Sequence, residues 1–310
     1  MPLNATLSNI LEQMAAANTP PLESMTPADA RQFYLALRPM AGEPEPVGEV
    51  AERKIPGPGG DIPVRIYKPE GPGPFPMLVY LHGGGFVIGS IETHDPLCRL
   101  LTNAAGCITV SVDYRLAPEH RFPAGLNDAY AATAWASANA TILGGQNDLI
   151  AVGGDSAGGN LATGVARMAR DKGTPPILYQ LLIYPGTDWG LDRPSYVENG
   201  EGYFLTKNAV AWFWSQYVED EADRTDPLAS PLRAEDLSNL PPALVVTAEF
   251  DPLRDEGEAY ALRLQEAGVA VDAIRYDGMI HGFFQMTGVL GEARTAVDAA
   301  AAKLRAAFAS

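Results

Sequence analysis

The sequence contains few cysteines, and this shortage excludes two classes of protein. Among 310 residues there are only Cys98 and Cys107, with no C-x-x-C pair. A small secreted scaffold held by many disulfides and a cysteine-rich zinc site are therefore both excluded. Cys98 lies in a probable helix and Cys107 opens a probable strand, so we expect two buried free thiols.

Positive charge is also scarce. The chain has 22 Lys and Arg against 38 Asp and Glu, a formal net charge of −16 at pH 7. Such a surface repels phosphate backbones and anionic lipid headgroups, so we expect no nucleic acid partner. Apolar runs of about 18 residues are absent, and the N-terminal residues lack the basic start and apolar centre of a signal peptide. We expect a cytoplasmic protein without membrane insertion.

Short apolar runs alternate with longer helical patterns through most of the chain. Strands that are apolar throughout are buried on both faces, as in parallel sheets, and the segments between them are long enough for crossover helices. With a hairpin formed by 47–55 and 62–68, this pattern predicts an α/β fold with a mostly parallel, eight-stranded sheet flanked by helices. The apolar runs are 76–81, 107–112, 149–153, 177–184, 243–248 and 271–276, and the helical patterns are 93–105, 124–139, 157–172, 255–267 and 292–307.

A glycine-rich turn follows the run 149–153. Residues 154–158, Gly-Asp-Ser-Ala-Gly, match the pattern G-x-S-x-G between a strand and a helix. In that pattern the serine backbone is strained, and the glycines keep side chains away from the neighbouring strand and helix. Ser156 would then stand at the carboxyl end of the sheet, beside the amides of a helix N-terminus, which favour negative charge. Taken alone, the pattern also fits a glycine-rich turn with an unimportant serine.

A nucleophilic serine needs an imidazole base, and the chain has only four histidines. His281 follows the last apolar run, so it is expected at the carboxyl end of a strand, where it can meet Ser156. Asp251 directly follows the run 243–248 and is the expected partner of this base. The order serine, aspartate, histidine is that of α/β-hydrolases. Glu249, Asp255 and Asp277 are nearby rivals to Asp251.

A second glycine-rich loop opens at His82 and continues through Gly83, Gly84 and Gly85. A loop of this kind brings backbone amides close to a developing oxyanion, because no side chains stand in the way. We expect the amides of Gly84, Gly85 and Ala157 to form an oxyanion hole.

Two other functions fit the glycine-rich turns less well. Gly153 and Gly158 have the spacing of the first and last glycines of a phosphate-binding P-loop. That loop requires Lys followed by Ser or Thr after its last glycine, but Gly159 and Asn160 follow Gly158. Gly83, Gly85 and Gly89, with Asp113 further on, imitate a dinucleotide fingerprint. That interpretation leaves the Ser156 turn, Asp251 and His281 unexplained, so we expect neither a cofactor nor a metal.

Five stretches in the same order resemble the hormone-sensitive-lipase-like (bacterial family IV) carboxylesterases of the α/β-hydrolase superfamily. The resemblance implies a cap made of N-terminal helices and an insertion after the sixth strand. The chain is thereby divided into 1–45 (N-terminal cap), 46–186 (first catalytic part), 187–225 (cap insertion) and 226–310 (second catalytic part). The five stretches are His82-Gly-Gly-Gly-Phe86, Asp113-Tyr-Arg-Leu-Ala-Pro-Glu119, Gly154-Asp-Ser-Ala-Gly-Gly-Asn160, Asp251-Pro-Leu-Arg-Asp-Glu256 and His281-Gly-Phe283.

Several side chains in these regions have expected roles outside the chemistry. Arg115, Asp113 and Glu119 are expected to brace the loop under the nucleophile by ion pairs. Residues 189–217 hold three of the four tryptophans, which are expected mostly to anchor the cap. Phe204 and Trp212 are the candidates for lining the substrate pocket.

The sequence thus predicts a serine carboxylesterase acting on small-molecule esters of short- to medium-chain acids. Ser156 is the expected nucleophile, with His281 as base and Asp251 as its orienting acid. A homodimer would be unsurprising for this family. Two alternatives stay open: a ligand receptor on the same fold, and a hydrolase of lactones, amides or thioesters.

Overall fold

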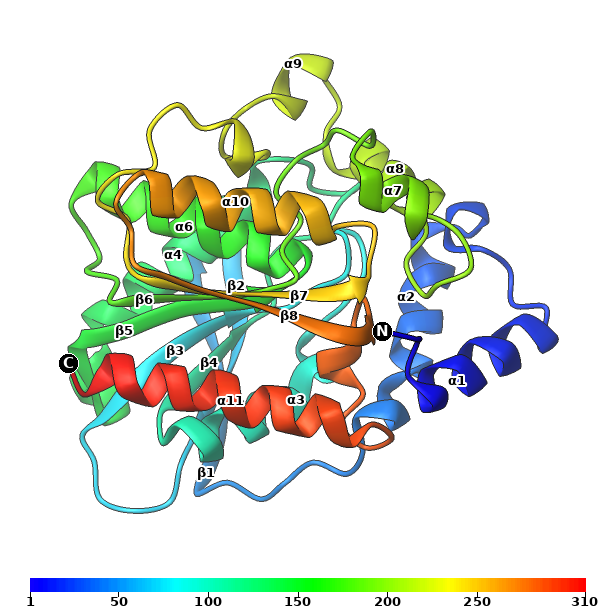
Figure 1. Cartoon of the computed structure of the whole chain (residues 1–310). Helices are drawn as coiled ribbons and strands as arrows, with labels where there is room; N and C mark the ends of the chain where they lie inside the picture. The colour runs from blue at the N-terminus through cyan, green and yellow to red at the C-terminus, as the bar shows by residue number, and fades with distance from the viewer.

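The computed structural model describes residues 1–310 and contains one sheet of eight strands with helices on both faces (Figure 1). The strand order is β1-β2-β4-β3-β5-β6-β7-β8. The hairpin strands β1 and β2 are antiparallel, β2 is antiparallel to β4, and all other neighbours are parallel. The predicted mostly parallel α/β fold is confirmed. The strands are β1 (Glu49–Gly57), β2 (Gly60–Lys68), β3 (Phe75–Leu81), β4 (Ile108–Val112), β5 (Gly145–Asp155), β6 (Tyr179–Ile183), β7 (Ala243–Phe250) and β8 (Val271–Ile280).

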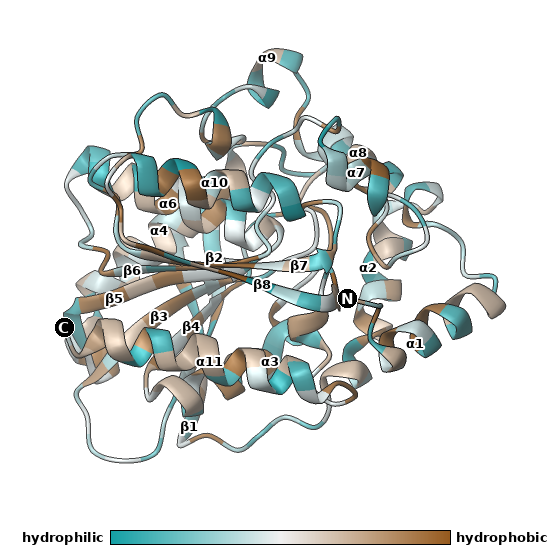
Figure 2. Cartoon of the chain, viewed as in Figure 1, coloured by the Kyte–Doolittle hydropathy of each residue, from teal (hydrophilic) through white to brown (hydrophobic).

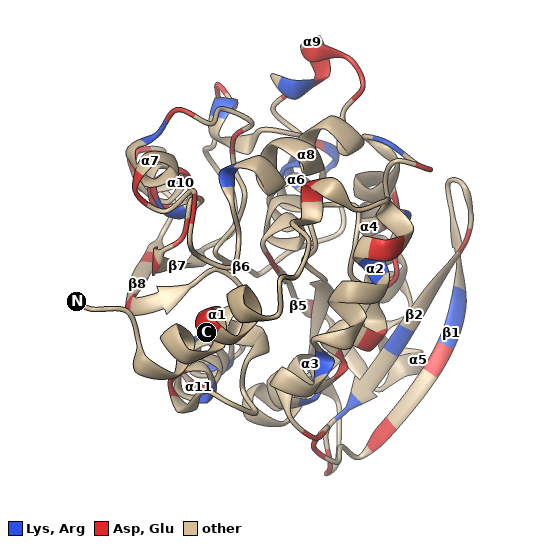
Figure 3. Ribbon diagram, turned by 90° about the vertical axis from the view of Figure 1, so that its right-hand side faces the viewer, with Lys and Arg blue, Asp and Glu red and all other residues tan.

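The central strands are buried because their side chains are apolar on both faces. Every residue of β4 and β6 is buried, and Figure 2 shows the sheet as a largely hydrophobic layer between helices with hydrophilic outer faces. Cys98 and Cys107 are free and buried, as predicted. Acidic residues are spread over many helices, loops and β1 (Figure 3). No helix is long and apolar enough to span a bilayer.

Helices cover each face of the sheet. In Figure 1, α3 and α11 lie on one face, and α4, α6 and α10 lie on the other. Local signals set their ends: α3 starts at a capping box of Ser90 and Thr93, and α6 ends at Gly173 in the left-handed conformation. The helices that flank the sheet on its two faces are α3 (Ile91–Ala105), α4 (Ala124–Ala138), α5 (Ala140–Leu143), α6 (Ala157–Lys172), α10 (Arg254–Glu266) and α11 (Gly291–Phe308).

Two separate parts of the chain lie beyond the carboxyl ends of the parallel strands (Figure 1). The first is the N-terminal segment, in which Thr26 caps α2 and Pro27 takes the first helical position, as its sequence indicates. The second follows β6, and its helix α8 contacts the N-terminal segment. These parts contain α1 (Ala5–Ala16), η1 (Leu22–Ser24), α2 (Pro27–Ala36) and η2 (Arg38–Ala41), and then α7 (Pro194–Glu198) and α8 (Lys207–Tyr217). The chain continues through α9 (Glu221–Arg224) and η3 (Pro231–Arg233), and η3 contacts α6 and α10.

Several strands are longer than their apolar runs predict. β5 continues to Asp155, β7 to Phe250 and β8 to Ile280, because pairing with neighbouring strands extends past the apolar residues. The extension brings Ser156, Asp251 and His281 directly past three strand ends. The 3₁₀ turn η4 (Phe283–Gln285) follows.

Candidate active site

Ser156 occupies a tight, strained turn between β5 and α6. Its backbone has φ 54° and ψ −119°, a conformation that non-glycine residues rarely adopt. Its N–H donates to the carbonyl of Ile183 at 2.9 Å. A Cβ added to Gly154 would lie 2.3 Å from the Leu81 oxygen, and one added to Gly158 only 1.9 Å from it. Both glycines of the G-x-S-x-G pattern are thus required by close backbone approach.

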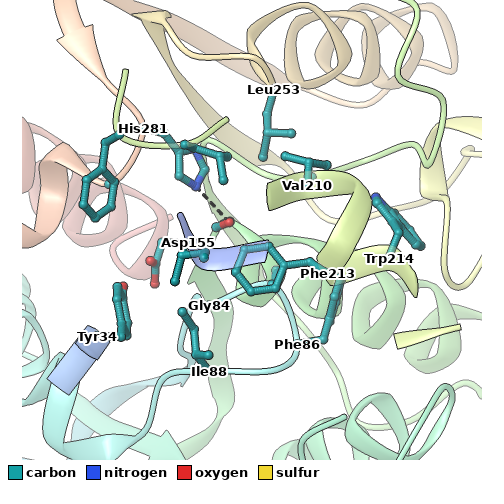
Figure 4. Close-up of a pocket in the computed structure, with 18 of the residues that line it drawn as sticks. Tyr34, Gly84, Phe86, Ile88, Asp155, Val210, Phe213, Trp214, Leu253 and His281 are labelled. Carbon is teal, nitrogen blue, oxygen red and sulfur yellow. Dashed lines mark hydrogen bonds between the residues drawn. The ribbon is translucent and has the colours of Figure 1, made fainter. Parts of the chain in front are cut away.

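An imidazole and a carboxylate stand in line with this serine. His281 Nε2 lies 2.9 Å from Ser156 Oγ, a contact drawn as a dashed line in Figure 4, and His281 Nδ1 lies 2.7 Å from Asp251 Oδ2. The other carboxylate oxygen of Asp251 accepts from the N–H of Leu253 at 2.8 Å. Because a carboxylate only accepts hydrogen bonds, Nδ1–H donates to Asp251, and the Nε2 lone pair faces the hydroxyl. The arrangement suits transfer of the serine proton to the ring.

The three rival carboxylates do not reach this imidazole. Glu249 accepts from the N–H of Gly278 at 2.7 Å and from the N-terminal ammonium. Asp255 pairs with Arg254 at 2.8 Å. Asp277 makes no side-chain hydrogen bond or ion pair. Asp251 alone lies at hydrogen-bond distance.

The loop after β3 presents free amides beside the serine. Gly84 and Gly85 have φ 122° and 56°, and the N–H groups of Gly84, Gly85 and Ala157 donate to no protein acceptor. All three residues line the same cavity as Ser156. A Cβ on Gly85 would lie 2.2 Å from the ring of Phe213, so only glycine lets α8 approach this loop. Unpaired amides of this kind can bind an oxyanion.

A buried carboxylate ties this loop to the serine turn. Asp155 Oδ1 accepts from the N–H of Gly83 at 3.1 Å and from the Tyr80 hydroxyl at 2.8 Å, and Oδ2 lies 3.2 Å from His94 Nε2. Burial of Asp155 opposes its ionisation, but the His94 imidazole and these hydrogen bonds outweigh burial and lower the pKa of the carboxyl. Asp155 thus holds the elbow and the loop together.

The chain is similar to known α/β-hydrolases. A family profile described as alpha/beta hydrolase fold matches residues 78–285. Carboxylic ester hydrolase LipN of Mycobacterium tuberculosis is 48% identical over 265 residues, which cover 83% of this chain and 70% of LipN. An arylesterase of Saccharolobus solfataricus is 42% identical over 296 residues, or 95% and 94% of the two chains. A hyperthermophilic esterase structure from the archaeon Pyrobaculum calidifontis has a TM-score of 0.95, with 48% identity and 99% of both chains covered.

The chain belongs to the hormone-sensitive-lipase-like family of α/β-hydrolases.

In this α/β-hydrolase His82 is not a second base. Burial lowers the pKa of His82 to about 3, so its ring stays neutral at physiological pH. Its Nδ1 donates to the carbonyl of Gly83 at 2.8 Å, and the ring stacks on Tyr114 with centroids 4.3 Å apart. His82 is therefore packed under the loop as a neutral side chain.

The segment 113–119 is braced differently from the prediction. Arg115 pairs with Asp128 of α4 at 2.8 Å, and Glu119 pairs with Arg31 of α2. Asp113 makes no ion pair. Arg115 and Glu119 do form ion pairs, but with residues 13 and 88 positions away on α4 and α2, which the motif itself does not reveal.

The cavity above Ser156 is mainly apolar and opens to solvent. Phe204 lines it, but Trp212 does not, which corrects the prediction. Trp212 packs behind Phe213 with ring centroids 5.1 Å apart, because successive helical residues point about 100° apart. Figure 4 shows Tyr34 on one side of His281 and Phe213 and Trp214 on the other.

One buried carboxyl near the cavity was missed in the sequence. Glu256 is fully buried, and its Oε1 accepts from the N–H of Thr187 at 2.6 Å and of Asp188 at 3.2 Å. Its Oε2 accepts from the Tyr196 hydroxyl at 2.9 Å. Burial raises the pKa of Glu256 to about 8. Its only sequence signal was its place at the end of the 251–256 motif.

Proposed function

We propose that this α/β-hydrolase is a serine carboxylesterase acting on esters of short- to medium-chain acids. The family and the curated relatives, a carboxylic ester hydrolase and an arylesterase among them, support ester hydrolysis. The observation that carries the proposal is the hydrogen-bonded series from Asp251 through His281 to Ser156, facing three free amides.

In the first half of the reaction, Ser156 Oγ attacks the ester carbonyl carbon while His281 Nε2 takes the hydroxyl proton. The carbonyl oxygen becomes an oxyanion, which accepts hydrogen bonds from Gly84, Gly85 and Ala157. Asp251 keeps Nδ1 protonated and stabilises the imidazolium. The tetrahedral intermediate then collapses, the bond to the alkoxy oxygen breaks, and His281 gives that oxygen the proton. The alcohol leaves, and the acyl group stays on Ser156.

In the second half, water replaces the alcohol. His281 Nε2 takes a proton from water as its oxygen attacks the acyl carbon, and the same amides bind the second oxyanion. Collapse returns the proton to Ser156 Oγ and releases the carboxylic acid.

The cavity favours an uncharged, apolar ester. Its lining is mainly hydrophobic, and apart from His281 it contains no basic side chain that could pair with a substrate carboxylate. Tyr34, Phe204 and Phe213 are among the aromatic residues expected to contact the substrate. Rates with p-nitrophenyl esters of increasing acyl length would define the preferred acid.

The substitution Ser156→Ala tests the proposal. The variant should fold normally and lose ester hydrolysis by several orders of magnitude, because the nucleophile is absent. A serine-reactive phosphonate should label the wild-type protein at Ser156 and leave the variant unlabelled. Ester turnover by the variant at the wild-type rate would refute the mechanism, and reversible ligand binding without labelling would favour a receptor.

We also propose a cytoplasmic location, supported by the two buried free thiols, which suit a reducing compartment. A homodimer stays a prediction from the sequence. Light scattering at several protein concentrations would measure the oligomeric state.

A further inference from the structure

The loop that carries the free amides has a backbone conformation that its own hydrogen bonds do not fully stabilise. Gly84 and Gly85 have positive φ, and so does Phe86, at 65°. Within the loop, the N–H groups of Val87 and Ile88 donate to the Gly84 carbonyl at 3.0 and 2.9 Å. A phenylalanine keeps a left-handed backbone only where surrounding contacts fix it. Contacts from outside the loop are therefore needed.

One such contact comes from Arg31, on helix α2 of the N-terminal segment. Its Nε donates to the carbonyl of Val87 at 2.8 Å, and its Nη2 donates to the carbonyl of Ala117 at 2.9 Å. The N–H of Ala117 in turn donates to the carbonyl of Phe86 at 2.9 Å. Arg31 thus holds the loop directly at Val87 and indirectly at Phe86.

The remaining hydrogen bonds of the guanidinium go to an exposed carboxylate. Nη1 and Nη2 donate to the two carboxylate oxygens of Glu119 at 2.8 and 2.6 Å. The Glu119 side chain is 53% exposed, so the ion pair itself contributes little to stability. Lysine cannot replace Arg31, because one ammonium group cannot reach three acceptors in a planar fork.

We propose that Arg31 is a positioning residue that keeps the amides of Gly84 and Gly85 aimed at the oxyanion. This inference rests on the proposed esterase function. Tyr34 lies one turn further along α2 and lines the cavity, so the helix that contacts the substrate also holds the oxyanion donors. A role confined to anchoring the cap would affect stability or substrate binding instead.

The test compares Arg31→Ala and Arg31→Lys with the wild-type enzyme. With p-nitrophenyl butyrate, kcat/KM should fall by about 10-fold or more in both variants, because misplaced donors stabilise the oxyanion less well. The inhibition constant of a short alkyl boronic acid, whose serine adduct places an oxygen at these amides, should rise by a similar factor. The inhibition constant of p-nitrophenyl butyl ether, which forms no tetrahedral adduct, should stay within about twofold.

Controls separate the alternatives. Glu119→Gln keeps the carbonyl contacts of Arg31, and its kcat/KM should stay within about threefold of wild type. If the thermal unfolding midpoint of Arg31→Ala shows it to be unfolded, Arg31→Lys carries the comparison, since it keeps the charge and most of the packing. A wild-type enzyme without esterase activity would overturn the proposed function and this inference together. If the wild-type enzyme is active and the Arg31 variants bind the boronic acid as tightly as wild type, only the proposed role of Arg31 is overturned.

Discussion

At the scale of single residues, the site depends on side chains held on strained backbone. Ser156, Phe86 and Tyr184 all have positive φ, and none is a glycine. All three lie at the site: Phe86 directly follows Gly84 and Gly85, and the Tyr184 ring packs on His281 with centroids 4.7 Å apart. Such strain persists where the surrounding fold fixes it, and it commonly marks functional positions.

Asp251→Asn should lower kcat about 10⁴-fold with little change in folding, because asparagine no longer holds the His281 tautomer that accepts the serine proton. Glu249→Gln is the matched control: it removes a carboxylate two residues away that does not contact His281. Steady-state kinetics of both variants check the assignment. Equal losses in the two variants would contradict it.

Gly158→Ala should be strongly destabilising, by about 3 kcal/mol or more, because the new methyl group would overlap backbone that cannot move away. The nearest atom, the Leu81 oxygen, would be 1.9 Å from it. At Gly291, in the first turn of α11, an added Cβ meets nothing within 4 Å, so Gly291→Ala should be neutral or slightly stabilising. Urea unfolding of both variants measures the difference. Unfolding of Gly158→Ala at the wild-type midpoint would show that the turn can open.

At the scale of elements, the N-terminal segment and the segment after β6 shape one side of the cavity. Phe204, between α7 and α8, lines the catalytic cavity and two neighbouring ones, the larger of which is lined by residues from α1 and the segment 202–209. Its ring packs on Gly282, where an added Cβ would lie 3.5 Å from it. Phe204 therefore stands as a partition between three spaces.

Phe204→Ala should join the catalytic cavity to its neighbours and let longer esters enter. We expect the ratio of kcat/KM for p-nitrophenyl decanoate to that for p-nitrophenyl acetate to rise about 10-fold, since a buried methylene contributes about 0.8 kcal/mol. Tyr203→Ala is the control, because Tyr203 lines only the neighbouring cavity beside α1 and not the catalytic cavity. A similar ratio in wild type and both variants would mean that Phe204 does not limit chain length.

At the scale of the whole molecule, one buried carboxyl connects the segment after β6 to a helix that packs on the sheet. Glu256 of α10 accepts from the backbone at Thr187 and Asp188 and from Tyr196 of α7. This single carboxyl therefore fixes the segment after β6 to a helix of the core. Because it is buried without a cation, its ionisation affects global stability.

The raised pKa of Glu256 predicts a pH-dependent stability. In the unfolded chain the carboxyl loses its proton near pH 4.5, but in the folded protein only near pH 8. Between these values the folded state binds more protons, so its stability falls as pH rises. Glu256→Gln has no such proton, so the unfolding free energy of wild type relative to this variant should fall by at least about 1 kcal/mol from pH 5 to pH 8.5. Guanidinium unfolding measures both free energies. If their difference stays the same from pH 5 to pH 8.5, the prediction is contradicted.

The amino-acid sequence by itself determined the alternation of strands and helices and the placing of Ser156, Asp251 and His281 after strands. These features are local: continuous apolar runs require burial on both faces, and the carboxyl ends of parallel strands meet at one edge of the sheet. The role of the glycines around Ser156 could also be predicted from the sequence, because a close backbone approach excludes side chains.

Only the tertiary structure decided which distant segments hold the site together. Arg31 reaches Val87, 56 residues away, and Glu256 reaches Thr187, 69 residues away. Neither contact has a periodicity or spacing that a sequence pattern could reveal. The face that α8 turns to the cavity, with Phe213 and Trp214 inward and Trp212 behind, was also set by packing. A helix that is aromatic on several sides has no single apolar stripe, so its orientation follows from the neighbours against which it packs.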